Sequence, residues 1–246
     1  EKTEQLYVLK ELKPIQSSLF YPFLSKVLQN VDVCSKRFLV NKVDRSVTGL
    51  VVQQQCVGPF HTPISNYNIM SFGYFDNHGV VSAIGEKPIL TLLNTEAAGT
   101  MAVAEMVTNM MGACVGNLNL VKCSGNWMWA LSKQGASEKL VCTAKAMVET
   151  MKFLALSIDG GKDSLSMTAS TKKSTVNSPD NLVITGYAHT VDFNKRVTPE
   201  LKKTGSQLVY IKFSNKVRLG GSVYQREQGK MGGETPNLDM NGLAAL

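Results

Sequence analysis

The sequence predicts a mixed domain of the α/β or α+β class, and three observations support this prediction. Of the 246 residues, 43% are apolar and 18% are charged, which is close to the average of globular proteins. Two helical patterns, at residues 95–115 and from Ser137 onward, are separated by a strand-like run, and further strand-like runs follow them. The length fits one large domain, or one domain and part of another.

The first third of the chain contains few regular patterns. Residues 1–34 include two prolines and have no strong periodicity, so we interpret them as a connector with one short helix. Strand-like Ile, Tyr and Phe residues follow at 64–74. The pair His78-Gly79 favours a turn, and a strand is expected to begin with Val80.

The strongest pattern is the helix at 95–115. Either Asn94 or Thr95 is a suitable N-cap, and the interior is apolar on nearly every side, which predicts a buried helix. Residues 118–130 are expected to form a strand. Ser137 is then a suitable cap for a second helix, which has one apolar face.

The last hundred residues return to strand patterns. The segment Asp159-Gly-Gly-Lys-Asp-Ser164 is polar and glycine-rich, which indicates a loop after a short apolar strand. Gly220-Gly221-Ser222 is typical of a helix start. The strands that we expect in this part lie at 153–158, 165–169, 182–188 and 207–213.

Composition excludes several functional classes. The net charge is +7, but Lys and Arg do not cluster as in a nucleic-acid arm, so we expect no nucleic-acid partner. The five cysteines are odd in number and form no C-x-x-C, which argues against a disulfide scaffold or a zinc ribbon and favours a reducing, cytoplasmic compartment. No apolar run is long enough to cross a membrane. The start lacks a signal core and an initiator Met, so we expect the chain to be a segment of a longer protein.

Glu105 and Asn109 are the most informative polar residues. They are four positions apart on an otherwise apolar helix, so they share one face. A carboxylate on a buried helix is costly unless it is paired or binds a metal. The pattern therefore leaves two interpretations open: an ion pair with a nearby Lys, or an oxygen-rich Mg²⁺ site.

The glycine-rich segment that contains Asp163 and Ser164 is a second candidate. Paired glycines let a ligand approach the backbone, whose N–H groups can form an anion nest; Asp163 could bind a cation and Ser164 a phosphate. The alternative is a plain hairpin turn. The Walker A pattern is not satisfied.

Four blocks of sequence closely resemble the large, eukaryotic-type phosphoribosylformylglycinamidine synthases, which are glutamine-dependent. The resemblance covers about 210 residues, from Ser35 to the end. The blocks are NKVDRSVTGLV from Asn41, QQQCVGP from Gln53, VKCSGNWMWA from Val121 and IDGGKDSLSM from Ile158.

The resemblance implies a fold and a domain division. The chain is similar to the second of two halves that each resemble aminoimidazole ribonucleotide synthetase. Residues 1–34 would be a connector from a preceding domain. Residues 35–192 would form a ferredoxin-like α+β N-terminal domain, and residues 193–246 the truncated start of an α/β C-terminal domain.

The resemblance also implies a reaction. Members of this family are ligases of purine biosynthesis that use ATP to convert formylglycinamide ribonucleotide and glutamine to formylglycinamidine ribonucleotide. ATP phosphorylates the amide oxygen, and ammonia from the glutaminase domain displaces the phosphate. The implied cofactors are Mg²⁺ and ATP or ADP. The first synthetase half of the same chain is an implied partner.

Site residues follow from the same resemblance. Glu105, Asn109 and Asp163 match the metal ligands of the family, and Ser164 falls beside its nucleotide-contacting Ser. Ser65 and Asn66 stand where the family has Ala and a metal-binding Asp, so Ser65 is expected at the nucleotide and Asn66 at the metal. No residue of this segment is expected to be catalytic.

Two other functional classes are alternatives to this family's reaction. One is a catalytically inactive structural relative, such as the tegument proteins of some herpesviruses. The intact Glu105, Asn109 and Asp163 argue against it, and Asn66 argues mildly for it. The other is a basic nucleic-acid binder, which would need clustered Lys and Arg with interleaved aromatic residues, and these are absent.

Overall fold

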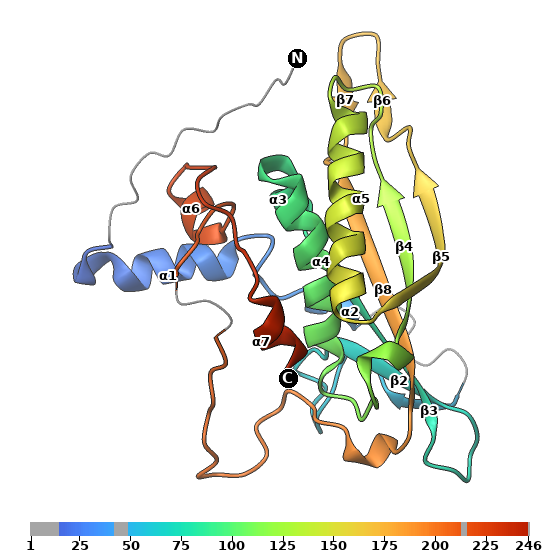
Figure 1. The fold of residues 1–246 in the computed structure, drawn as a ribbon. Helices are drawn as coiled ribbons and strands as arrows, with labels where there is room; N and C mark the ends of the chain where they lie inside the picture. Colours follow the sequence, from blue (N-terminus) through green and yellow to red (C-terminus); the bar gives the residue numbers. More distant parts are fainter. Residues whose placement is uncertain (1–14, 42–48, 213–215, 246) are drawn as a thin grey trace.

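A computed structural model of the chain describes residues 15–41, 49–212 and 216–245. Its centre is a six-stranded sheet with the strand order β1-β2-β3-β8-β4-β5 (Figure 1). All neighbouring strands of this sheet are antiparallel except β4 and β5, which are parallel. The strands are β1 Val51–Gln53, β2 Tyr67–Ser71, β3 Gly79–Glu86, β4 Lys122–Met128, β5 Ser157–Ser164, β8 Asn181–Thr190, and a separate hairpin of β6 Thr168–Ser170 and β7 Thr175–Asn177.

Helices α3, α4 and α5 lie on one side of the sheet (Figure 1). The helices are α1 Phe20–Gln29, α2 Arg37–Val40, α3 Pro88–Leu93, α4 Thr95–Met110, α5 Ala136–Phe153, α6 Val223–Glu227 and α7 Met240–Ala244. Short 3-10 helices lie at Ser17–Leu19, Leu118–Leu120 and Phe193–Lys195. This mixture of helices with a mixed sheet confirms the predicted α+β class. Within the described ranges, no helix has the length and apolar character needed to cross a membrane.

Helix α4 is the buried helix that the sequence predicts. The Asn94 side chain accepts a hydrogen bond from the backbone N–H of Ala97 at 2.9 Å, which confirms the cap. The helix ends at Met110 rather than at residue 115. It packs very closely on β3: a Cβ atom at Gly85 would lie 2.0 Å from the carbonyl oxygen of Ala102. This position on the sheet therefore requires glycine.

Helix α5 begins earlier than predicted. Gly135 adopts a left-handed conformation with φ 76° and precedes the first helical residue, Ala136. Ser137 is thus inside the first turn, so its prediction as the N-cap was wrong, and no side chain caps this end. The predicted strand at 118–130 is a 3-10 turn followed by β4.

The glycine-rich segment forms strand β5, so the predicted loop was wrong. Helix α5 continues to Phe153, where the sequence suggested a strand, and β5 begins only at Ser157. The glycines let β5 approach β4, because a Cβ atom at Gly161 would lie 2.7 Å from the carbonyl oxygen of Gly125. Because β5 is the edge strand of the sheet, its ladder with β4 uses the backbone groups that face β4, and the extended segment forms no loop that would gather successive N–H groups into an anion nest.

Two other predicted strands differ from the structure. Of the strand predicted at 165–169, only residues 168 and 169 are extended, as the start of β6. Residues 207–212 form no strand, and Phe213 lies outside the described residues. The side chain of Leu208 is 85% exposed. A strand needs a neighbour for its backbone groups, and the described part of the chain offers none here.

The two ends of the described chain pack against other elements. Helix α6 begins after Ser222, whose hydroxyl accepts from the N–H of Gln225, so the predicted helix start is confirmed. Leu243 of α7 is 1% exposed and belongs to the main core. Helix α1, the short helix expected in the connector, contacts α6 through the rings of Phe23 and Tyr224. The division of the chain at residue 192 stays a prediction.

Candidate functional site

Glu105 lies on the side of α4 that faces the end of β3. One carboxylate oxygen, Oε2, accepts the backbone N–H of Glu86 at 2.7 Å. The other, Oε1, forms an ion pair with the ammonium group of Lys87. The two side chains are 30% and 28% exposed, so the pair is partly open to solvent. The ion pair is one of the two alternatives that the sequence left open.

Asn109, one turn along α4, reaches the same strand. Its amide nitrogen donates to the carbonyl oxygen of Ile84 at 2.8 Å. That hydrogen bond uses the nitrogen and leaves the amide oxygen of Asn109 as the atom for another partner. The sequence predicted that Glu105 and Asn109 share one helix face, and the structure brings both to the last residues of β3.

The side chains of Glu86 and Asn181 meet on the other face of the sheet, away from α4, because Gly85 and Gly186 are the residues of β3 and β8 that face the helix. The amide nitrogen of Asn181, the first residue of β8, donates to Oε2 of Glu86 at 2.7 Å. Asn181 is only 8% exposed, and its Oδ1 is buried without a hydrogen-bond partner in the described structure. A buried acceptor without a donor is costly unless a cation or a donor reaches it. Carboxylate and amide oxygens are the ligands that Mg²⁺ prefers, so Glu105 and Asn109, which share one face of α4, fit the ion.

Asn66 lies at the same end of the sheet. It is exposed and immediately precedes β2, whose register begins with the pair Tyr67 and Ala83. Because the two strands are antiparallel, the residue before Tyr67 lies next to Ile84, which carries the hydrogen bond of Asn109. This register places the backbone of Asn66 near that of Ile84, and its assignment to the metal stays a prediction.

The side chain of Ser65 is buried and hydrogen-bonded within the chain. The side chain is 8% exposed, and its hydroxyl donates to the carbonyl oxygen of Tyr67 at 2.8 Å. The same hydroxyl accepts from the amide nitrogen of Gln53 at 2.7 Å. These bonds hold the hydroxyl within the chain, so a nucleotide contact by Ser65 would have to use its backbone or break them.

Asp163 and Ser164 lie elsewhere on the sheet. Across the register, Glu86 pairs with Val183, which pairs with Asn126 on β4, and Asn126 pairs with Lys162 on β5. Three strand spacings separate β3 from β5, or about 14 Å. The structure thus does not bring Asp163 to Glu105.

Both residues of β5 are nevertheless accessible. Asp163 is exposed, and the hydroxyl of Ser164 accepts from the ammonium group of Lys162 at 2.6 Å. Their assignment to a metal and a nucleotide stays a prediction. Within the described residues, no group of three or more His, Cys, Asp or Glu side chains could hold a metal by itself.

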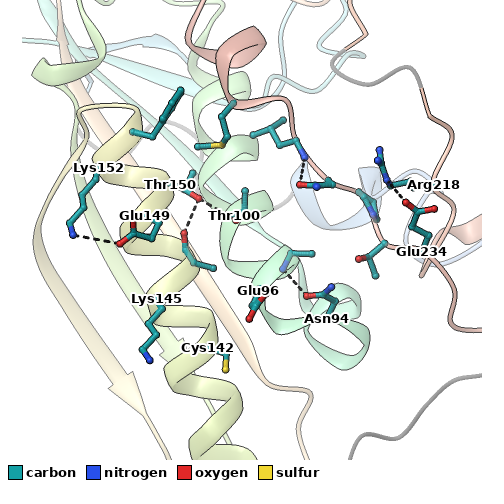
Figure 2. A pocket seen from close by; sticks show the side chains of 18 residues that line it. Asn94, Glu96, Thr100, Cys142, Lys145, Glu149, Thr150, Lys152, Arg218 and Glu234 are labelled. Atoms are coloured by element: carbon teal, nitrogen blue, oxygen red, sulfur yellow. Dashed lines mark hydrogen bonds and ion pairs between the residues drawn. The ribbon is translucent and has the colours of Figure 1, made fainter.

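A separate groove of about 1110 Å³ lies over the outer sides of α4 and α5, beside residues 234–240 (Figure 2). Its charges are largely paired with one another: Arg218 bonds Glu234 at 2.9 Å, and Lys152 bonds Glu149 at 3.5 Å. None of the site residues expected from the sequence lines it. The groove is therefore not the predicted site.

The buried thiol of Cys123 is not activated. Burial raises the pKa of Cys123 on β4 to about 11, with a smaller contribution from the Asp159 carboxylate. A thiol with such a pKa is a poor nucleophile at neutral pH. All five cysteines are free.

Sequence reasoning missed the two residues that bond the Glu105 carboxylate, namely Glu86 and Lys87. An ion pair with a Lys was foreseen, but its partner was not identified. The available signal was Glu86-Lys87-Pro88 at the end of a strand, where a charged pair meets a proline that starts a helix.

Comparison with known proteins places the chain in a family. Residues 35–189, well over half of the chain, match the family model described as FGAR-AT PurM_N-like domain. Two relatives are phosphoribosylformylglycinamidine synthases. The protein of Drosophila melanogaster is 42% identical over 94% of this chain and 17% of its own length, and the human protein is 44% identical over 88% and 16%. The chain thus spans about a sixth of these relatives.

Solved structures agree on the fold. PurLQS from Thermotoga maritima matches with a TM-score of 0.52 and 15% identity, over 81% of this chain and 29% of that one. PurL from the same organism, complexed with ADP, matches with a TM-score of 0.51 and 16% identity over the same shares. From the family model and these matches we conclude that the chain belongs to the FGAR-AT PurM_N-like domain family.

Proposed function

We propose that the protein that carries this chain is an ATP-dependent amidoligase of purine biosynthesis. It would convert formylglycinamide ribonucleotide, glutamine, ATP and water to formylglycinamidine ribonucleotide, glutamate, ADP and phosphate. The family membership and the relatives, named as phosphoribosylformylglycinamidine synthases at 42% and 44% identity, support this proposal. A cytoplasmic location and a glutaminase domain elsewhere in the protein are parts of the same proposal.

The role that we propose for this segment is to bind Mg²⁺ and a nucleotide. The observation that carries it is the convergence of the Glu105 and Asn109 side chains on the backbone at the end of β3, where they meet the N–H of Glu86 and the carbonyl oxygen of Ile84. When bound, Mg²⁺ would neutralise phosphate charge. Glu105, Asn109 and Asn66 would hold it.

The chain's own residues prepare this site. The N–H of Glu86 orients the Glu105 carboxylate, and the Ile84 carbonyl fixes the Asn109 amide nitrogen, so both oxygen donors are positioned before any ligand arrives. Such preorganisation lowers the ordering cost of binding. If Asp163 and Ser164 contact the same nucleotide, they would do so from β5, which is three strands away from β3.

Calorimetric titration of the full-length protein with ADP, with and without Mg²⁺, tests the proposal. We expect Glu105→Gln to weaken Mg²⁺-dependent ADP binding at least tenfold, because it removes a charged oxygen ligand. Glu138→Gln is the matched control: it removes an equal charge from an exposed position in the first turn of α5 and should leave binding unchanged. Equal binding by the Glu105→Gln variant would reject the site.

Asn66 favours a second candidate function for this segment, namely a structural nucleotide site that binds ADP without turning it over. Asn in place of a carboxylate lowers the charge of the donor set, as expected for a nucleotide site that binds without turnover. In that case the Glu105→Gln variant would lose ADP binding and stability. The molecules that remain folded would keep the steady-state turnover of the unaltered protein at saturating substrate.

A further inference from the structure

Lys87 connects β3 to α3 directly beside the proposed magnesium site. Its backbone is fixed, because its carbonyl oxygen accepts both the N–H and the hydroxyl of Thr91, at 3.1 Å each. Thr91 is 3% exposed and Pro88 begins the helix, so this end of α3 cannot move easily. Only the tip of the Lys87 side chain is tethered, through its ion pair with Glu105.

The two oxygens of Glu105 are held in different ways. Oε2 is bound by a neutral backbone N–H, which orients the carboxylate without cancelling its charge. Oε1 is bound by the Lys87 ammonium, which supplies the positive charge that a metal would otherwise supply. An ammonium group and a divalent cation on the same oxygen would repel each other strongly, so only one of them can occupy it.

The ammonium is replaceable. The pair is partly exposed, with 28% and 30% of the two side chains accessible, and such pairs contribute little stability. The Lys stem has four flexible carbons, so the tip can leave while the backbone stays in place. A divalent cation that arrived at Oε1 would in addition find the amide oxygen of Asn109 on the same face of α4, which the ammonium of Lys87 does not use.

We propose that Lys87 competes with Mg²⁺ for Oε1 of Glu105, and so weakens binding of the metal alone. This inference rests on the proposed function, since it requires Glu105 to be a metal ligand. Lys87 is then a positioning residue: it holds the carboxylate in place and yields it to the metal. If the ion pair had only a structural role, removal of Lys87 would not tighten the binding of the metal.

Binding of Mn²⁺, used as a probe for Mg²⁺, to the full-length protein without nucleotide tests the proposal by electron paramagnetic resonance. We expect Lys87→Met to bind Mn²⁺ roughly fivefold more tightly, the order of one partly exposed ion pair. Lys87→Gln keeps a polar tip without the charge and should behave likewise. Lys145→Met removes an equal charge from an exposed position on α5 and should change the affinity little.

The same variants in a Glu105→Gln background complete the cycle. There the effect of Lys87→Met should vanish, because the shared oxygen no longer carries the charge. Unchanged or weaker Mn²⁺ binding by both Lys87 variants would overturn the proposal, and so would an equal gain in the Glu105→Gln background.

A separate measurement distinguishes failure of the proposed function from failure of the competition by Lys87. If the unaltered protein bound no Mn²⁺ even with ADP, the proposed function would fail. A gain of Mn²⁺ binding in Lys87→Met that depends on Glu105 would still support the competition. The absence of binding in every variant would reject both.

Discussion

Gly85 is the position at which one added methyl group should damage the domain most clearly. A Cβ atom there would lie 2.0 Å from the carbonyl oxygen of Ala102 and 2.5 Å from the backbone nitrogen of Met106. Ordinary contacts of a Cβ atom begin near 3.4 Å, so α4 would have to move by more than 1 Å. Both of these atoms belong to the helix backbone, which cannot relieve the clash by a change of rotamer as a side chain can. Overpacking of this kind costs about 2–3 kcal/mol.

Hydrogen exchange of the α4 amides in the full-length protein measures this cost. The Gly85→Ala change should lower the protection of α4 about 30- to 150-fold, since each 1.4 kcal/mol corresponds to a factor of ten. It should also weaken Mg²⁺-dependent ADP binding, because Glu86 and Glu105 are held by the same contact between β3 and α4.

Gly160→Ala is the matched control. A Cβ atom at Gly160, also in a strand, would have its nearest neighbour at 3.8 Å, so the change should be neutral or stabilise slightly by restricting the unfolded chain. Protection of α4 in Gly85→Ala equal to that in Gly160→Ala would refute the packing argument.

Three further predictions concern single side chains. Asn66→Asp adds a carboxylate directly before β2 and should tighten Mg²⁺-dependent ADP binding roughly tenfold by calorimetry, whereas Asn68→Asp, an exposed change within β2, should not; equal effects would mean that Asn66 is no ligand. Asn94→Ala removes the cap of α4 and should destabilise its first turn by about 1 kcal/mol in hydrogen exchange, while Asn94→Ser should retain most of it. Burial raises the pKa of Cys123 to about 11, so the stability that the folded state gains from this group at neutral pH is lost as the pH rises toward that value. Cys123 should therefore resist iodoacetamide at pH 9 until the chain is unfolded. Rapid alkylation of the native chain would contradict this prediction.

The parts of the fold that depend on local sequence could be predicted from it. Helix α4 and its Asn94 cap follow from periodicity and from a polar residue at the start, which act within one turn. The confirmed start of α6 at Ser222 has the same origin. Fold class and family followed from longer blocks of sequence.

The parts that were missed depend on distant neighbours. The glycines of β5 suggest a loop by composition, yet the segment becomes a strand because β4 offers its edge. Residues 207–212 show the reverse: their composition suggests a strand, but pairing needs a partner that the described chain does not provide. The partner of Glu105 was likewise hidden, because Lys87 is 18 residues away and reaches it only when β3 packs on α4.

The isolated chain should be inactive and should self-associate. The relatives are about six times longer, and the proposed reaction needs ammonia from another domain, so we expect no phosphate release from ATP with formylglycinamide ribonucleotide and ammonia. Self-association follows from an exposed apolar segment whose side chains are 55–86% accessible: Leu208, Val209, Tyr210 and Ile211. Extended apolar segments with unpaired backbone groups add to exposed strands of other molecules.

Size-exclusion chromatography with light scattering tests that mechanism, because it can separate this segment from other exposed surface. The double change Val209→Lys and Ile211→Lys places two charges in the segment and should shift the chain toward the monomer. Val176→Lys is the control: it adds a charge at a residue of β7 that is 65% exposed but lies outside the segment. If both variants associate as the parent does, another surface drives association. A monomeric parent that also released phosphate would contradict the requirement for further domains, since one molecule of this chain would then contain every group that the reaction needs.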